Sequence, residues 1–268
     1  MLVPIKSSGG KPPLFFVHGY HGILFSLGAD FARELGSDQP FYGFHANGMD
    51  GRQPVINNVR EMVPAYFDEL QRAWPEGPLR IGGQCQGCYV AVEIARMLRE
   101  TGRQTGPVIL ADPSPVPGQD RRRRTIDPSD PRIAGRLYEE ARHALMDNAS
   151  RSHNNLPFDP TDPKQLHAAT LAVMGAVVAF AGYVPSPYPG PVEMIISMRR
   201  ARSFFHPLMP YQKLFPDQRI VHVLPYNHHE IFKAGQKTLA RLIRSMLEEK
   251  PASENDIDVD DRALSSQP

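Results

Sequence analysis

Residues 79–87 of this 268-residue chain are Leu-Arg-Ile-Gly-Gly-Gln-Cys-Gln-Gly, and they decide the fold. The apolar run Leu79–Ile81 predicts a buried strand, and Cys88–Leu98 has the apolar spacing of a helix. Between them stands Gly83-Gln-Cys85-Gln-Gly87, the pattern of a sharp strand-to-helix turn with a nucleophile at its centre, here cysteine in place of the usual serine. The strand before and the helix after favour this interpretation over a buried cysteine beside a glycine-rich turn.

Each position of this turn has a physical reason. The turn is so tight that its central residue adopts a strained backbone, and side chains at Gly83 and Gly87 would collide across it. It lifts the sulfur of Cys85 above the edge of the sheet and directs the first amides of the next helix at an acyl oxygen. Because a helix N-terminus favours thiolate, a lowered pKa is expected for Cys85.

Outside this turn, strand and helix patterns alternate along the chain. The alternation predicts an α/β fold, with a mostly parallel central sheet and helices on both faces. The further expected strands are Leu14–Val17, Phe41–Phe44, Val108–Ala111, Val192–Ser197 and Arg219–Leu224, and the further expected helices are Phe25–Leu35, Val59–Trp74 and Ile231–Leu247.

Residues 113–191 interrupt the alternation. They contain no strand signal, and helices are expected at Ile133–Asp147 and Lys164–Tyr183. Such a stretch is too long for an ordinary connection, so it predicts a helical insertion. We expect the core in residues 1–112 and 192–250, the insertion at 113–191, and a disordered acidic tail at 251–268.

A cysteine nucleophile needs an acid and a histidine from later strands, in that chain order. Asp112 directly follows the strand Val108–Ala111, and strand ends of this kind line the ligand crevice. For the base, His228 and His229 both follow the last strand, and only one of them can face the sulfur. We assign His228 as the base and Asp112 as the acid that fixes its tautomer, and we expect His229 to be exposed.

An oxyanion hole is expected beside the cysteine. It would use the backbone N–H of Gln86 and one from the turn after the first apolar strand, at Gly19 or Tyr20. The alternative interpretation of the Gly19 region is a tight turn without a catalytic role.

Two further features have alternative interpretations. Cys85 and Cys88 form a C-x-x-C pair, which suits a redox dithiol or half of a zinc site. Since the chain has only these 2 cysteines, structural zinc is disfavoured, and Cys88 is expected to pack as a small residue. The run Arg121–Arg124 is typical of a solvated loop, and it would suit an acidic partner or a phosphate if it has a function.

The overall composition excludes several classes of protein. Lys and Arg number 30 against 29 Asp and Glu, and a net charge of +1 gives no case for nucleic acid or an anionic membrane as partner. The cysteines are too few and too close for a secreted disulfide framework. With no signal-peptide pattern and no apolar run of about 18 residues, we expect a cytoplasmic protein.

Four motifs in order carry a family resemblance: Pro13–Gly19, Pro40–Phe44, Trp74–Pro78 and Gly82–Gly87. Over about residues 3–247 the chain resembles the thioesterase domains of nonribosomal peptide and polyketide synthases. The resemblance implies an α/β-hydrolase fold, with 113–191 as a helical lid and with Asp112 and His228 at the family's acid and histidine positions. It also implies an acyl group delivered on the phosphopantetheine arm of a carrier protein, released by hydrolysis, cyclisation or transfer, with no metal and no cofactor bound by the chain itself.

The chain departs from the family at the nucleophile and beside it. Cys85 replaces the usual serine, Gln84 and Gln86 replace apolar neighbours, and Cys88 stands where a second glycine is common. Moving an acyl group from a pantetheine thiol to Cys85 exchanges one thioester for another, so the step is nearly balanced. This weights the expectation toward transfer or cyclisation, in natural-product biosynthesis. A shuttle of aminoacyl groups between carriers, a small ester or lactone hydrolase, and a noncatalytic partner-binding relative remain the alternatives.

Overall fold

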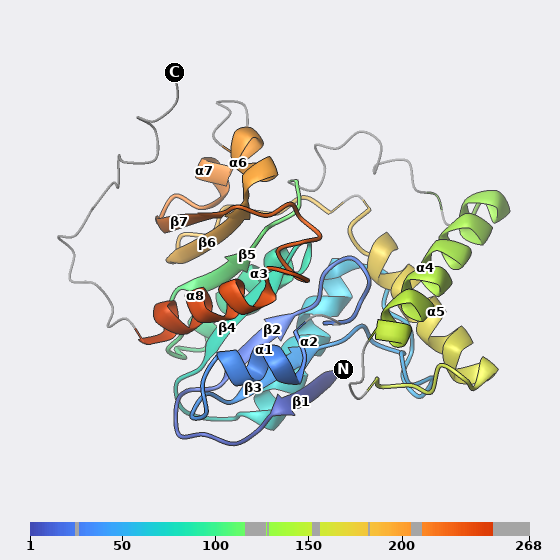
Figure 1. Cartoon of the computed structure of the whole chain (residues 1–268), viewed down its shortest axis with the longest axis horizontal. Coiled ribbons are helices and arrows are strands. Elements are labelled where there is room, and N and C mark those ends of the chain that lie inside the picture. The colour runs from blue at the N-terminus through green and yellow to red at the C-terminus, as the bar shows by residue number, and fades with distance from the viewer. Residues whose placement is uncertain are drawn as a thin grey trace.

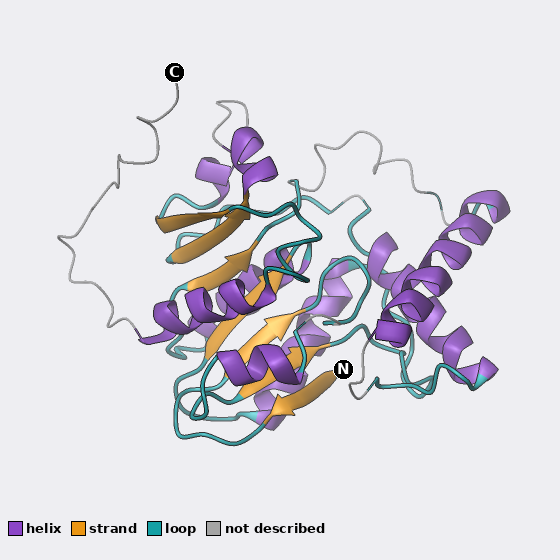
Figure 2. Ribbon diagram, viewed as in Figure 1, coloured by secondary structure: helices purple, strands orange, loops and turns teal. Residues whose placement is uncertain are grey.

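The computed structural model of the chain describes residues 1–24, 27–115, 127, 129–151, 156–181, 183–204 and 211–248 (Figure 1). A central sheet runs through the molecule, with helices on both of its faces (Figure 2). The expected tail at 251–268 and the run Arg121–Arg124 lie outside the described residues, as do Phe25 and Ser26 of an expected helix.

The sheet has seven strands in the order β1-β3-β2-β4-β5-β6-β7. All neighbouring pairs are parallel except β1 with β3, which is antiparallel. The mostly parallel sheet expected from the sequence is therefore confirmed. The strands are β1 (Leu2–Lys6), β2 (Leu14–Val17), β3 (Phe41–Phe44), β4 (Arg80–Gln84), β5 (Val108–Ala111), β6 (Val192–Ser197) and β7 (Gln218–Leu224).

Two helical layers cover the sheet (Figure 1). On one face α2 (Val59–Ala73) and α3 (Gly87–Glu100) pack against apolar side chains such as Phe15 and Ile81. On the other face α1 (Ala29–Glu34) and α8 (Gln236–Glu248) pack against Phe16 and Ile109. Adjacent residues of one strand thus serve opposite cores, as the two-residue period of a strand requires.

The segment between β5 and β6 contains α4 (Pro131–Arg151) and α5 (Pro163–Val178), which pack on each other beside the sheet (Figure 1). Their apolar faces share a cluster with Ile23, Ala46 and Met49, which follow β2 and β3. The two helices therefore sit over the loops at the carboxyl ends of the strands.

The chain that leaves α5 is tied to α3. Tyr183 donates a 3.1 Å hydrogen bond to Oε1 of Glu93, and Arg96 donates a 3.0 Å bond to the carbonyl of Pro187. Glu93 and Arg96 are themselves paired at 3.1 Å. Because α3 begins at the strand-to-helix turn, the insertion is anchored to the helix that follows Cys85.

Four elements differ from the sequence expectations. Strand β1 was not expected, and it pairs antiparallel with β3 at the edge of the sheet. The short helices α6 (Met198–Phe204) and α7 (Tyr211–Leu214) between β6 and β7 were not expected either. Helix α8 begins at Gln236 and not at Ile231. Ile231 and Phe232 lie in a series of turns, and because they are buried there, their apolar side chains resemble the start of a helix in the sequence.

Candidate active site

The strand-to-helix turn places Cys85 between β4 and α3 with a φ of 54°. Both flanking glycines are required by close backbone contacts. A Cβ on Gly83 would lie 2.4 Å from the carbonyl oxygen of Gly87, across the turn as expected. A Cβ on Gly87 would lie 2.1 Å from the carbonyl oxygen of His18, so that glycine is needed by a neighbouring turn and not by its own.

The backbone of Cys85 is fixed on both sides by the chain after β5. Its N–H donates a 3.0 Å bond to the carbonyl of Ala111, and its carbonyl accepts a 3.1 Å bond from the N–H of Ser114. The side chain is 7% exposed. The turn and the segment containing Asp112 therefore form one rigid unit.

Asp112 directly follows β5, has a φ of 47° and is fully buried. Its Oδ1 accepts a 2.7 Å hydrogen bond from the N–H of Ser197, at the end of β6. Its Oδ2 lies 2.6 Å from Nδ1 of His228. Asp112 follows β5 and His228 follows β7, so two parallel strands, with β6 between them, deliver the carboxylate and the imidazole to the same edge of the sheet.

His228 lies in the turn after β7. The side chain of Asn227 accepts 3.0 Å bonds from the N–H groups of His229 and Glu230 and so shapes this turn. Since Nδ1 of His228 faces Asp112, Nε2 is the ring nitrogen left for the thiol of Cys85, which lies within hydrogen-bonding reach. His229 is exposed, as the sequence led us to expect.

The electrostatics favour a thiolate–imidazolium pair. Burial opposes ionisation of the Cys85 thiol, but the hydrogen bonds and charges of His228 and Arg200 together outweigh it and lower the pKa of Cys85. Burial likewise opposes charging of His228, yet the hydrogen bonds with Asp112 and Cys85 raise the pKa of His228 to about 9. A cysteine beside a protonated histidine is the activated form of a thiol nucleophile.

Gln86 and Gly19, two of the three residues expected to supply the oxyanion hole, lie beside Cys85. Gln86 is the N-cap of α3, where backbone N–H groups point out of the helix. Gly19 approaches closely, since a Cβ on it would lie 3.2 Å from Cβ of Cys85. Tyr20 packs against the apolar cluster that α4 and α5 share with the loops after β2 and β3.

A buried network fixes the turn that carries Gly19. Nε2 of His18 lies 2.7 Å from the hydroxyl of Tyr66 on α2, and Nδ1 lies 2.8 Å from the carbonyl of Gly19. Burial lowers the pKa of His18 to about 4, so its ring is neutral near pH 7. A sequence pattern predicts the turn, but no pattern indicates this support from α2.

Sequence analysis also missed Arg200, on α6. Its Nη1 donates to the backbone carbonyls of Asp112 and Pro113, and its Nε lies 3.5 Å from Oδ2 of Asp112. It also lies within hydrogen-bonding reach of the Cys85 thiol. No local pattern marks this arginine among its neighbours, because only the fold brings it to β5.

Cys88 is fully buried, and its thiol donates to the carbonyl of Gly83 at 3.1 Å. Burial, with the neighbouring Cys85, raises the pKa of Cys88 well above the ordinary range of a thiol. Within the described ranges, no group of three or more His, Cys, Asp or Glu is placed to hold a metal ion. No helix in those ranges is both long and apolar enough to span a bilayer.

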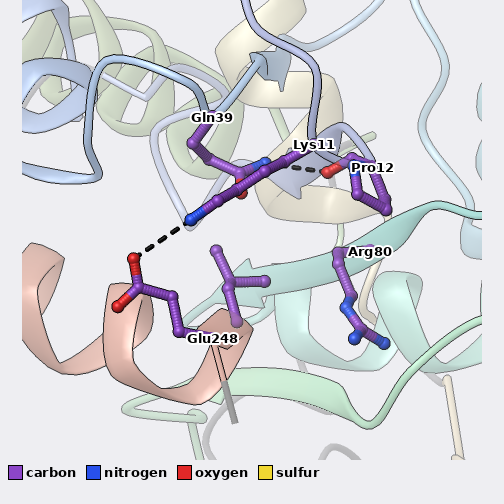
Figure 3. Close-up of a pocket in the computed structure, with 6 residues that line it drawn as sticks. Lys11, Pro12, Gln39, Arg80 and Glu248 are labelled. Atoms are coloured by element: carbon purple, nitrogen blue, oxygen red, sulfur yellow. Dashed lines mark hydrogen bonds and ion pairs between the residues drawn. The ribbon is translucent and has the colours of Figure 1, made fainter. Parts of the chain in front are cut away.

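Figure 3 shows a pocket of about 270 Å³ at the opposite edge of the sheet. It lies beside Arg80, where β4 begins, whereas Cys85 follows the end of that strand. An ion pair of 3.0 Å joins Lys11 to Glu248 across it, and Gln39 donates to the carbonyl of Pro12 at 2.8 Å. This pocket is therefore not part of the candidate active site.

Comparison with known proteins shows which family the chain is similar to. The model described as "Thioesterase domain" matches residues 12–162. Malpinin synthetase of Mortierella alpina is 37% identical over 112 residues, which are 42% of this chain and 1% of that protein. Atromentin synthetase of Tapinella panuoides is 35% identical over 104 residues, 38% of this chain and 11% of that protein. The chain thus spans about a tenth or less of the length of these curated relatives.

The solved Vlm2 thioesterase domain, bound with a dodecadepsipeptide, has the same fold. It matches with a TM-score of 0.67 at 20% identity, over 92% of this chain and 97% of that one. Structural neighbours of this kind confirm the α/β-hydrolase architecture expected from the sequence.

Proposed function

This chain belongs to the thioesterase domain family, and from that premise we propose that Cys85 accepts an acyl or peptidyl group from a carrier-protein or CoA thioester. The observation that carries the proposal is the 2.6 Å contact between Asp112 and His228 beside a buried thiol of lowered pKa. A triad in the order cysteine, aspartate, histidine has the chain order of α/β-hydrolases.

In the proposed acylation, the thiolate of Cys85 attacks the thioester carbonyl and forms a tetrahedral intermediate. The N–H of Gln86, with one from Gly19 or Tyr20, stabilises the oxyanion. When the intermediate collapses, the pantetheine sulfur leaves and takes the proton held by His228. The product is an acyl thioester on Cys85, and Asp112 holds the imidazole in one tautomer throughout.

Release needs a second nucleophile. Neutral His228 takes a proton from water, from a hydroxyl or amine of the acyl chain itself, or from another thiol, and the nucleophile displaces Cys85. These three choices give hydrolysis, cyclisation or transfer. The cysteine is the specific feature that favours transfer between carriers as the second candidate function, because an acyl-cysteine stays activated toward a thiol.

We propose a carrier protein bearing a phosphopantetheine arm as the partner, and natural-product biosynthesis as the setting. Support comes from the relatives, which include malpinin synthetase and atromentin synthetase. The helices α4 and α5 over the strand ends are in the place of a lid and disfavour a simple small-ester hydrolase. A noncatalytic role is disfavoured by the assembled Cys85, His228 and Asp112.

The test is intact-protein mass spectrometry after mixing the chain with a panel of acyl-pantetheine and acyl-carrier thioesters. Wild type, C85A and C88A are compared. An acyl adduct that disappears in C85A and persists in C88A is expected. Free acid, cyclic product or label on a second carrier protein then distinguishes the three fates. Loss of the adduct in C88A alone, or no adduct on folded wild type across the panel, would overturn the proposal.

A further inference from the structure

Arg200 is a charged group at the site that has no role in the proposed mechanism of Cys85, His228 and Asp112. It reaches them from α6, an element outside the sheet, and contacts Asp112 through both backbone and carboxylate. Its side chain is 21% exposed, so most of it is withdrawn from water. An arginine held in this way is pre-organised and permanently charged.

The charge of the site explains why a cation belongs there. With Cys85 as thiolate, His228 as imidazolium and Asp112 as carboxylate, the three groups carry a net charge of −1. Cys85 is 7% exposed and Asp112 is fully buried, so water does little to compensate that charge. Unbalanced charge in such a place is costly. Adding Arg200 makes the group of four neutral.

We propose that Arg200 is the counter-charge that keeps Cys85 ionised in the resting site, and not only a clamp on the backbone of Asp112. The inference rests on the proposed function of Cys85 as nucleophile. It concerns the free enzyme, however, so it can be tested without knowing the acyl group. In this role Arg200 and His228 share the stabilisation of the thiolate.

The other ionisable groups around the thiol do not replace Arg200. Cys88 on α3 stays neutral, since burial raises its pKa. Burial lowers the pKa of His21 and His229, and the positive charges of their neighbours lower it further. Lys233 contributes to both of those shifts but is exposed, so solvent screens its charge. Arg200 and His228 are the groups whose hydrogen bonds and charges lower the pKa of Cys85.

The experiment measures the pH dependence of Cys85 alkylation by iodoacetamide in the full chain, by mass spectrometry with fragmentation to locate the label. Thiolate, not thiol, reacts, so the profile reports ionisation. R200Q removes the charge but keeps hydrogen-bond donors, and R200K keeps the charge. R199M, on the exposed neighbouring residue of α6, is the matched control, and buried Cys88 is the internal reference for unfolding.

For R200Q we expect the apparent pKa of Cys85 to rise by about one unit, which lowers the alkylation rate about tenfold at neutral pH. R200K should stay within about threefold of wild type, and R199M should match it. A wild-type profile in R200Q overturns the proposal, as does an R200K profile shifted as far as that of R200Q. If R200Q does not unfold cooperatively on heating, the test rests on R200K. In that case the counter-charge role is overturned if Cys85 of R200K shows the same pH profile of alkylation as in the urea-unfolded chain.

The acyl-adduct measurement on the same variants separates the two proposals. Alkylation that depends on Arg200, without any acyl adduct in wild type, would support the counter-charge and count against the thioester substrate. An acyl adduct together with an alkylation rate that is unchanged in the Arg200 variants would support the thioester substrate and count against the counter-charge.

Discussion

A Cβ atom on Gly87 would lie 2.1 Å from the carbonyl oxygen of His18, far inside a van der Waals contact. Helix α3 and the turn after β2 therefore touch backbone to backbone at this point. Because Cys85 precedes Gly87 by two residues and Gly19 follows His18, this contact also sets the spacing between the thiol and the expected oxyanion hole. Gly87 is therefore needed by the turn after β2 and by the geometry of the site.

G87A should destabilise the fold by about 3 kcal/mol or more, since the added methyl meets backbone atoms that cannot rotate away. G135A is the matched control with the opposite expected sign. Gly135 lies exposed inside α4 with open space at its Cβ, so alanine there should stabilise by about 1 kcal/mol. Urea unfolding of both variants measures the difference. Equal midpoints for G87A and wild type would contradict the contact.

H228A should lower the rate of Cys85 acylation by a factor on the order of 10² to 10⁴, because the base that pairs with the thiol is lost. The acylation rate of H229A should stay within a few-fold of wild type, because the His229 side chain is exposed. Alanine also keeps the backbone N–H that donates to Asn227. Single-turnover acylation of the two variants measures both rates. The reverse outcome would move the base to His229.

The pH dependence of acylation should show the thiolate–imidazolium pair. Imidazolium is lost as pH rises through the raised His228 pKa of about 9, so the wild-type rate should fall above that pH. On the acid side the rate should hold until pH drops below the lowered Cys85 pKa and the thiolate is protonated. C85S should instead rise with pH over the same range, because a serine needs the histidine neutral. Quench-flow rates with an acyl-pantetheine thioester test this, and parallel profiles for the two enzymes would contradict it.

Much of the fold could be predicted because its signals are local. The apolar runs at β2, β5 and β6 are buried on both faces, which makes them continuous and easy to recognise. Cys85, Asp112 and His228 could be predicted because Cys85 and Asp112 directly follow strands, His228 lies in the turn after another strand, and parallel strands end at one edge of the sheet. Their catalytic roles remain predictions.

Other features depend on contacts that a local pattern does not carry. The apolar residues around Ile231 predict a helix, yet in the structure they are buried from turns. Strand β1 contains Pro4 and becomes a strand through its partner β3. Arg200 lies 88 residues after Asp112 in the sequence, so their contact could not be inferred from spacing.

Among the described residues, Cys85 and Asp112 are the non-glycine positions with positive φ. Any L-residue with a side chain bears a conformational cost there, and glycine would adopt the same angles without it. At these two positions, selection for a more stable backbone and selection for chemistry pull in opposite directions. In a lineage that no longer needed the reaction, we expect glycine to be accepted at Cys85 early, which makes that position an indicator of retained activity.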